Sequence, residues 1–201
     1  MIDFERALRR ATLRDDRAAA AVAAFAERAA REGLIDVAYA TVDSPVGPLL
    51  VAQTKRGLVR IAYPMMPRDN VLLELAEDIS PRVLESAARL DSVRRQLDEY
   101  FEGRRSRFDL KVDWRLSHGF QRRVLSRTAR IPYGKVSTYK TIAAAAGSPR
   151  GARAAGNALG ANPIPIVVPC HRVLHTGGGL GGYGGGLDRK EFLLNLEGVR
   201  A

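Results

Sequence analysis

The segment IPIVVPCHRVLHTGGGLGGYGGG, residues 164–186, limits most strongly how this chain can fold. Eight of the ten residues from 177 to 186 are glycine, which destabilises the interior of helices and strands. We therefore expect a loop there, whose backbone can approach another group closely. The prolines at 163, 165 and 169 have the opposite effect, because they restrict the backbone that enters the segment. Cys170, the only cysteine of the chain, follows this restricted entry.

Composition narrows the class of protein. One cysteine cannot form an internal disulfide or a cysteine-rich zinc site, so we expect no metal and a reducing, cytoplasmic setting. The N-terminus MIDFERALRR has no apolar stretch of a signal peptide, and no apolar run approaches the roughly 18 residues that span a membrane. A net charge of +10 and a pI near 10.3 favour a polyanionic partner such as nucleic acid, although a merely basic surface would give the same numbers.

The first half reads as a helix followed by a small sheet. Residues 3–32 are rich in Ala, Arg and Glu, which predicts a helix. Three short β-rich runs between residues 36 and 64 are separated by the turn sequences DSPVG and TKRG, which predicts a three-stranded antiparallel meander. Residues 70–101 are expected to be helical, and RFDLKVDW to be a short strand or an extended crossing. We expect three parts: an N-terminal extension (1–35), an N-terminal domain (36–116) and a C-terminal domain (117–201).

The second half contains a candidate helix-turn-helix. A helix in GFQRRVLSRTARI is followed by one that Ser137 can cap and that ends near Gly147. Ser148 is then expected to cap another helix, with Pro149 at its first position. Two helices joined by so short a turn can bind DNA, but an ordinary helix pair has the same pattern.

The second helix of this pair carries mostly small residues, with Arg153 and Asn157 standing out. A small-residue face permits close approach to a backbone or a narrow groove but offers little direct reading of base sequence. Minor-groove proteins commonly insert one side chain into the base stack, and Arg153 is the candidate for that insertion. The alternative is that the small residues only pack this helix against a neighbour.

Cys170 and His171 form a candidate nucleophile and base. A cysteine reacts as its thiolate and needs a base nearby, and such a base is commonly oriented by an acid. Neighbouring side chains in an extended segment point to opposite faces, so a bridging water is a plausible link between the two residues. Glu191 and Glu197 are the candidate acids. A lone cysteine is often simply buried, but Arg172 and His171 are costly neighbours for an inert buried thiol.

The segment from residue 164 to 198 resembles the active-site segment of the O6-alkylguanine-DNA alkyltransferases, also called methylated-DNA–protein-cysteine methyltransferases. The preceding sequence, from FQRRVLSRTARIPYGKVSTYK onward, resembles the same family in order and spacing, so the likeness covers about residues 118–198. DSPVGPLLVAQTKRGLVRIAY resembles the first strands of its ribonuclease-H-like domain. The resemblance implies an α+β fold. It would comprise a ribonuclease-H-like domain, with a three-stranded antiparallel sheet plus helices, and a mostly helical, winged-helix-like domain with a helix-turn-helix.

The resemblance also implies catalytic roles. Cys170 lies at the position of the alkyl acceptor, and His171 at that of its water-linked base. Glu197 corresponds to the carboxylate that orients the histidine, and Asn162 to the asparagine that braces the active-site turn. Tyr139 corresponds to the tyrosine that hydrogen-bonds the flipped base and rotates its 3′ phosphate.

Binding roles follow in the same way. Tyr183 and Gly184 correspond to the loop that binds the base, and the carbonyls of Cys170 and Val173 to acceptors for its exocyclic amine. Arg153 corresponds to the arginine finger that takes the vacated place in the stack. The residues that we expect to contact DNA are Tyr139, Ser148, Arg150, Arg153, Asn157 and Arg172.

The implied function is direct-reversal DNA repair. The chain would flip O6-alkylguanine, mainly O6-methylguanine and secondarily O4-methylthymine, out of duplex DNA and move the alkyl group irreversibly to Cys170. We expect a monomer without cofactor that binds the minor groove with little sequence specificity, and leave open whether it binds cooperatively. The four-cysteine zinc domain of larger members is missing, and Gly184 stands where some relatives have serine. Two other classes stay open: a non-catalytic helix-turn-helix regulator and a Cys-His-Glu hydrolase.

Overall fold

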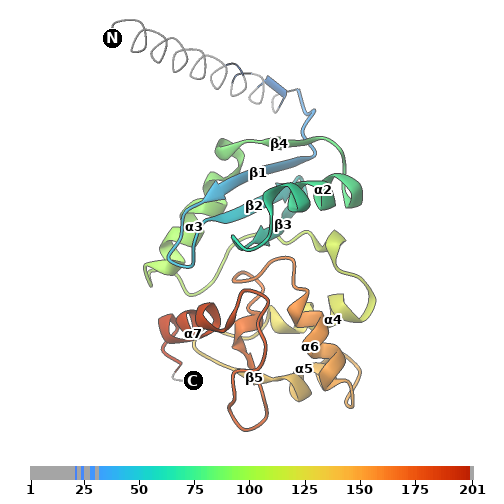
Figure 1. The fold of residues 1–201 in the computed structure, drawn as a ribbon, viewed down its shortest axis with the longest axis vertical. Helices are drawn as coiled ribbons and strands as arrows, with labels where there is room; N and C mark the ends of the chain where they lie inside the picture. Colours follow the sequence, from blue (N-terminus) through green and yellow to red (C-terminus); the bar gives the residue numbers. More distant parts are fainter. Residues whose placement is uncertain (1–20, 22–23, 25–27, 30–31, 200–201) are drawn as a thin grey trace, which may run out of the picture.

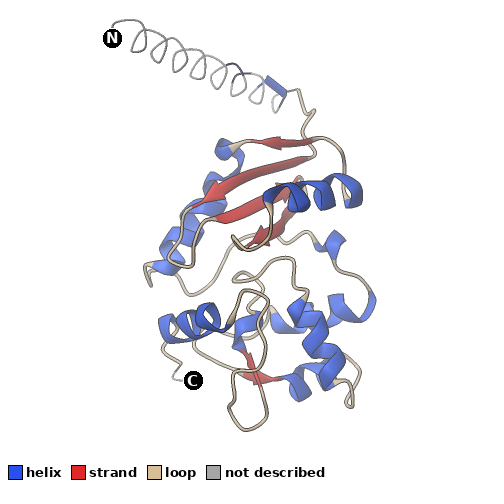
Figure 2. Ribbon diagram, viewed as in Figure 1, coloured by secondary structure: helices blue, strands red, loops and turns tan. Residues whose placement is uncertain are grey.

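A computed structural model describes residues 21, 24, 28–29 and 32–199 (Figure 1). Most of the helix expected over residues 3–32 therefore lies outside the described residues. The remaining chain forms a sheet with flanking helices, followed by a mostly helical part, which confirms the expected α+β class (Figure 2). No helix in the described part of the chain is long and apolar enough to cross a membrane.

The N-terminal sheet is built on the expected meander. β1 (Val37–Val42), β2 (Leu49–Thr54) and β3 (Gly57–Ala62) pair antiparallel in sequence order. The sheet has a fourth strand, because β4 (Val83–Glu85) adds to the free edge of β1 in parallel. The sequence thus predicts the three antiparallel strands but not the fourth strand, β4.

The same short strand corrects the prediction of one helical stretch over residues 70–101. That stretch is divided into α2 (Arg68–Asp78), β4, the 3₁₀ helix η1 (Ala87–Leu90) and α3 (Asp91–Phe101). Pro81 lies in the connection between α2 and β4, where a helix interior would not accept it.

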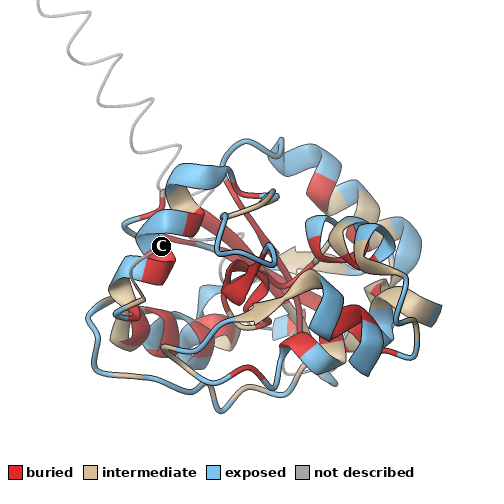
Figure 3. Cartoon of the chain, turned by 90° about the horizontal axis from the view of Figure 1, so that it is seen from below, coloured by how far each residue is buried: buried red, intermediate tan, exposed pale blue. Residues whose placement is uncertain are grey.

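Alternation along the strands gives the sheet two buried faces. Val37, Tyr39 and Val59 lie on the face that packs against Val71 and Leu75 of α2. The opposite face joins a larger core, which includes α3 and continues into the C-terminal half. Its members include Ala38, Ala40, Val51, Ile61, Leu97, Val124 and Ile142. Figure 3 shows buried residues gathered in the interior and exposed residues around the outside.

The chain between the halves runs along the outer edge of β3. The amide of Leu58 donates to the carbonyl of Lys111, and the amide of Asp113 donates back to the carbonyl of Leu58, both at 2.8 Å. A short strand or an extended crossing was expected here, and the segment makes a single isolated bridge, between Leu58 and Val112. The 3₁₀ helix η2 (Trp114–Leu116) follows. A Cβ on Gly57 would lie 2.2 Å from the carbonyl oxygen of Lys111, so glycine permits this close approach.

The C-terminal half begins with α4 (Gly119–Thr128), followed by α5 (Tyr139–Ala145) and α6 (Ala152–Gly160), which pack on one another. The 3₁₀ helix η3 (Cys170–Arg172) and the closing helix α7 (Leu187–Leu196) complete it. Two short strands, β5 (Ser137–Thr138) and β6 (Val173–Leu174), pair in parallel.

The helix pair forms as expected, but its caps differ. Thr138, not Ser137, caps α5, and its hydroxyl accepts from the amide of Thr141. Gly147 has the expected positive φ, 85°. Ser148 does not cap α6, since its carbonyl instead accepts from the amide of Gly151, the residue before the helix. One tight turn thus separates Gly147 from α6.

Candidate functional site: a buried thiol between two halves

Asn162 fixes the turn that presents Cys170. Its Nδ2 donates to the carbonyl of Val168 at 2.8 Å and to Sγ of Cys170 at 3.1 Å, and its Oδ1 accepts from the amide of Ile164. Ile166, at the centre of the turn, has φ 73°, a strained value for a β-branched residue. The structure therefore brings the predicted brace to the thiol, in a turn held against local strain.

His171 and Glu197 also meet as predicted. Nε2 of His171 lies 2.9 Å from Oε1 of Glu197, and both side chains are fully buried. Because a carboxylate only accepts, Nε2 must carry the proton when the ring is neutral. Nδ1 is then an acceptor, and it has no hydrogen-bond partner among the described residues. The ring is thus oriented by Glu197 and keeps one nitrogen for a proton.

Arg172, which we expected to contact DNA, points into the protein. Its Nε and Nη2 each donate to Glu197 at 2.8 Å, and its Nη1 donates to the carbonyl of Ile131. The side chain is buried, so it cannot reach DNA phosphates. We therefore revise its role: Arg172 clamps the carboxylate that orients His171.

Glu197 receives hydrogen bonds from both halves of the protein. Besides His171 and Arg172, the hydroxyl of Tyr100 on α3 donates to it at 2.7 Å. Burial alone would raise the pKa of Glu197, but the hydrogen bonds from His171 and Arg172 outweigh burial and lower it to about 2. The carboxylate is therefore ionised at neutral pH and available to the histidine.

The electrostatics keep the resting pair of Cys170 and His171 neutral. Burial raises the pKa of Cys170, against the opposing effects of the Asn162 hydrogen bond and the Lys190 charge. Burial lowers the pKa of His171, although Glu197 partly opposes this. A thiol in this state has to lose its proton before it can act as a nucleophile, and Nδ1 of His171 is available as an acceptor.

Tyr139 and the glycine-rich loop form the next part of the site. The hydroxyl of Tyr139, the first residue of α5, donates to the carbonyl of Gly182 at 3.2 Å. A Cβ on Gly184 would lie 2.9 Å from the carbonyl oxygen of Gly160 at the end of α6. Glycine at 184 thus lets the loop contact the helix backbone directly.

Lys190 is a site residue that sequence reasoning missed. Its ammonium donates to the carbonyl of Val173 at 2.7 Å and to that of Leu180, and the side chain is fully buried. Burial lowers its pKa to about 8. Lys190 therefore ties β6 to the start of the loop, on the carbonyl of Val173 that we expected to accept from the base. A carbonyl oxygen has two lone pairs, so the bond from Lys190 does not by itself prevent Val173 from accepting a second hydrogen bond.

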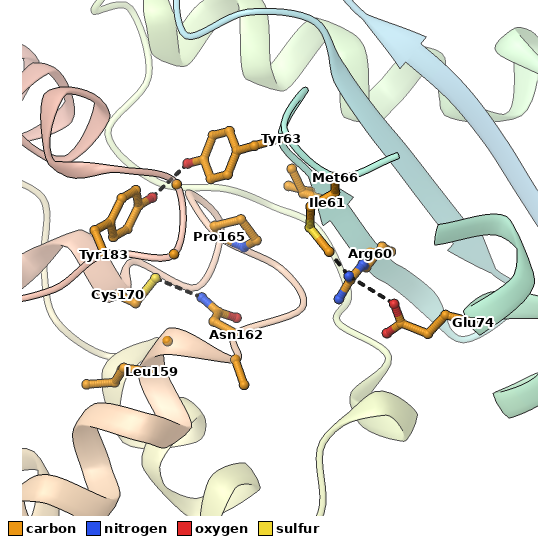
Figure 4. A pocket seen from close by; sticks show the side chains of 14 residues that line it. Arg60, Ile61, Tyr63, Met66, Glu74, Leu159, Asn162, Pro165, Cys170 and Tyr183 are labelled. Atoms are coloured by element: carbon orange, nitrogen blue, oxygen red, sulfur yellow. Dashed lines mark hydrogen bonds and ion pairs between the residues drawn. The ribbon is translucent and has the colours of Figure 1, made fainter. Parts of the chain in front are cut away.

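Two hollows flank this loop. One, of about 640 Å³, is lined by Tyr139, Arg153, Asn157 and His175. The other, of about 310 Å³, holds Cys170 and extends to residues of β3 and α2 in the N-terminal half (Figure 4). Gly160, Tyr183 and Gly184 line both hollows and so lie between them. The phenol of Tyr183 is held at 2.7 Å by the hydroxyl of Tyr63.

Exposed cationic and polar side chains line the larger hollow, of about 640 Å³. Arg153 and Asn157 are exposed and lie four residues apart, on one face of α6. Arg150 is exposed just before the helix, and Ser148 is half-buried in the turn. Among the described residues, no three His, Cys, Asp or Glu side chains gather to hold a metal ion.

Comparisons with known proteins agree with this geometry. The family description "6-O-methylguanine DNA methyltransferase, DNA binding domain" matches residues 119–199, and "6-O-methylguanine DNA methyltransferase, ribonuclease-like domain" matches residues 37–114. A methylated-DNA–protein-cysteine methyltransferase of Mycolicibacterium paratuberculosis is 44% identical over 161 residues, which are 80% of this chain and 92% of that protein. One of Methanosarcina barkeri is 40% identical over 159 residues, 79% of this chain and 96% of that protein.

A solved structure extends the likeness to three dimensions. The Mycobacterium tuberculosis protein OGT, in complex with DNA, is 39% identical and superimposes with a TM-score of 0.66, covering 80% of this chain and 92% of that one. Both halves of the chain and the turn around its single thiol therefore agree with one assignment. The chain belongs to the 6-O-methylguanine DNA methyltransferase family, whose members are methylated-DNA–protein-cysteine methyltransferases.

Proposed function

We propose that this protein repairs O6-alkylguanine in DNA by moving the alkyl group to Sγ of its own Cys170. The observation that carries the proposal is the set of contacts around the thiol. Sγ accepts from Asn162, while His171 is oriented by Glu197 and keeps Nδ1 without a partner among the described residues. A nucleophile, a base and an orienting acid are thus assembled in one buried site.

The reaction is a displacement at saturated carbon. The thiol proton passes through water to His171, the S–C bond forms, and the C–O6 bond breaks with its electron pair moving to the purine oxygen. The purine becomes neutral guanine when it gains a proton in place of the alkyl group. Negative charge on the purine would be stabilised by hydrogen bonds from the hydroxyl of Tyr139 and the amide of Gly184, each worth about 1.5–3 kcal/mol to a charged group.

The damaged base must leave the stack to reach Cys170, because the thiol is buried and lines a cavity that the glycine-rich loop also lines. We place α6 in the minor groove, with Arg153 in the vacated position. The small side chains of α6 can make few sequence-specific contacts with base edges, so the protein would bind DNA mainly through phosphate contacts. We propose that it acts as a monomer. The same displacement at O4-methylthymine would be a secondary reaction.

The alkylated protein would not turn over. An acyl intermediate of a hydrolase is open to water at a carbonyl carbon, whereas an S-alkyl cysteine has no such carbon. Cys170 is the only cysteine of the chain, so no second thiol of the same chain can remove the adduct. The protein is therefore a reagent that reacts once.

The test is a titration of the full chain with duplex DNA that contains O6-methylguanine. We expect a plateau near one methyl group accepted per chain, a mass gain of one methylene located on Cys170, and no methanol. Repair that continues well past one equivalent would contradict the proposal, and so would an adduct on another side chain.

A further inference from the structure

Arg60 reaches the cavity of Cys170 from the N-terminal half. It lies on β3, and with Met66 and Glu74 it lines the 310 Å³ cavity that also holds Cys170 (Figure 4). The residue is 93% buried, since only 7% of its surface is exposed. In Figure 4 its guanidinium extends from β3 toward the side of the cavity where Cys170 and Asn162 lie. Nothing in the proposed transfer of a methyl group uses this arginine.

The guanidinium has unused donors. Nη2 is 3.0 Å from Oε2 of Glu74 and 3.7 Å from Sδ of Met66. Nε is buried and has no partner, and no hydrogen bond from Nη1 lies within the described part of the chain. A buried guanidinium that leaves N–H groups unpaired is costly unless a ligand can accept from them. Arg60 is therefore arranged to receive an acceptor atom.

The geometry of the reaction points a longer alkyl group toward this arginine. In-line displacement places the reacting carbon between O6 and Sγ, so the rest of a longer group must turn aside into the space beside Sγ. That space is the cavity that Arg60 lines, and it is far larger than one methyl group needs. Pro165 and Ile61 give it apolar walls between the thiol and the guanidinium (Figure 4).

We propose that Arg60 selects O6-alkyl groups that carry a neutral hydrogen-bond acceptor beyond the reacting carbon, such as 2-hydroxyethyl. A neutral acceptor is favoured over an anion because Glu74 lines the same cavity and already balances the charge of Arg60. The N–H groups of Arg60 that Glu74 does not occupy can then donate to a neutral acceptor. The inference rests on the proposed alkyl transfer, and it makes Arg60 a specificity-determining residue.

The experiment compares single-turnover rate constants on duplexes that contain O6-methyl, O6-(2-hydroxyethyl) or O6-propyl guanine. Propyl matches hydroxyethyl in length but ends in a methyl group. We expect the wild-type protein to react faster with hydroxyethyl than with propyl, and Arg60→Met to lower this ratio about tenfold, as for loss of a hydrogen bond to a charged group. Arg68→Met is the matched control. Arg68 is paired with Glu85 in the same half, does not line the cavity, and should leave the ratio unchanged.

Two further variants sharpen the result. Arg60→Lys keeps a cation opposite Glu74 but lacks the unused guanidinium donors, so the ratio should fall here too even if Arg60→Met folds poorly. Glu74→Gln should speed reaction with O6-carboxymethylguanine relative to hydroxyethyl, because it removes the opposing carboxylate. An unchanged hydroxyethyl-to-propyl ratio in both Arg60 variants would overturn the inference. Failure of the wild type to transfer methyl at all would instead overturn the proposed function.

Discussion

The hydroxyl of Tyr100 donates a hydrogen bond of 2.7 Å to Oε1 of Glu197, although 97 residues separate them in the sequence. Tyr100 is on α3 of the N-terminal half and is fully buried, whereas Glu197 ends α7 in the C-terminal half. The same carboxylate oxygen faces Nε2 of His171. The N-terminal half thus contributes, through Glu197, to the orientation of the proposed base.

Replacement of Tyr100 by Phe should therefore affect both stability and alkyl transfer. The hydroxyl donates to a charged acceptor, so we expect about 1.5–3 kcal/mol less unfolding free energy and a slower transfer rate. Tyr133→Phe is the control, because its hydroxyl donates to the carbonyl of Leu196 and should cost only about 0.5–1.5 kcal/mol. Denaturant unfolding and single-turnover kinetics measure the two effects. Equal losses of rate in the two variants would contradict a role through Glu197.

Cys170→Ala should abolish alkyl transfer and leave DNA binding intact. The thiol is the proposed acceptor, whereas the exposed side chains of α6 are unchanged in this variant. Mass spectrometry after incubation with methylated duplex measures the transfer, and fluorescence anisotropy measures the binding. Methyl transfer to any other residue of the variant would exclude Cys170 as the sole acceptor.

Arg153→Ala should slow repair of duplex DNA far more than the reaction with free O6-benzylguanine. Arg153 is exposed on α6 and lines the outer hollow, whereas Cys170 lines the inner one. An arginine that fills the base stack matters only when a stack is present. Rate constants on both substrates give the comparison, and equal losses would show that Arg153 acts in another way.

Gly184→Ala should impair alkyl transfer more than Gly182→Ala. A Cβ at 184 would meet the carbonyl oxygen of Gly160 at 2.9 Å, whereas a Cβ at 182 has no atom within 4 Å. Gly184→Ala must therefore move the loop or the end of α6, whereas the added methyl group of Gly182→Ala fits without such a movement. Transfer rates of the two variants test this difference, and a larger loss at 182 would contradict the contact.

Cys170 should titrate above the ordinary thiol range in the folded protein without DNA. Burial raises its pKa, so the neutral thiol persists to higher pH than in an exposed cysteine. Alkylation by iodoacetamide at pH 7 should accordingly be slower for the folded protein than for the denatured one. The ultraviolet absorbance of the thiolate, taken as the difference between the wild type and Cys170→Ala, gives the midpoint. A midpoint below that of a free thiol would contradict the neutral resting state.

The sequence predicts the main features of the site because its motifs are local. Pro-Cys-His and Asn162 lie within ten residues of each other, so their meeting depends on one short turn. The fate of Arg172 could not be predicted in this way, because a residue next to an active-site histidine can face either DNA or the interior. The direction of Arg172 depends on where Glu197 lies relative to η3, which only the fold determines.

Contacts over long sequence distances explain the other differences. In the sequence, Tyr100 looks like one more apolar position of an amphipathic helix, and only the fold shows its bond to Glu197. Lys190 likewise looks like a surface lysine, and only the fold shows its bond to the carbonyl of Val173. β4 is only three residues long, too short to show a period of two, and forms because the edge of β1 is free. Ser148 and Pro149 form a plausible helix start, but the turn to Gly151 comes first.

The pairing of Leu58 with Lys111 and Asp113 has a consequence for the solubility of the separate halves. An unpaired outer strand is a template for association with other chains, and here the connecting segment occupies that side of β3. Expression of residues 36–105 alone would uncover this side and the apolar face that meets the C-terminal half. The connection between the halves thus also protects the sheet from aggregation.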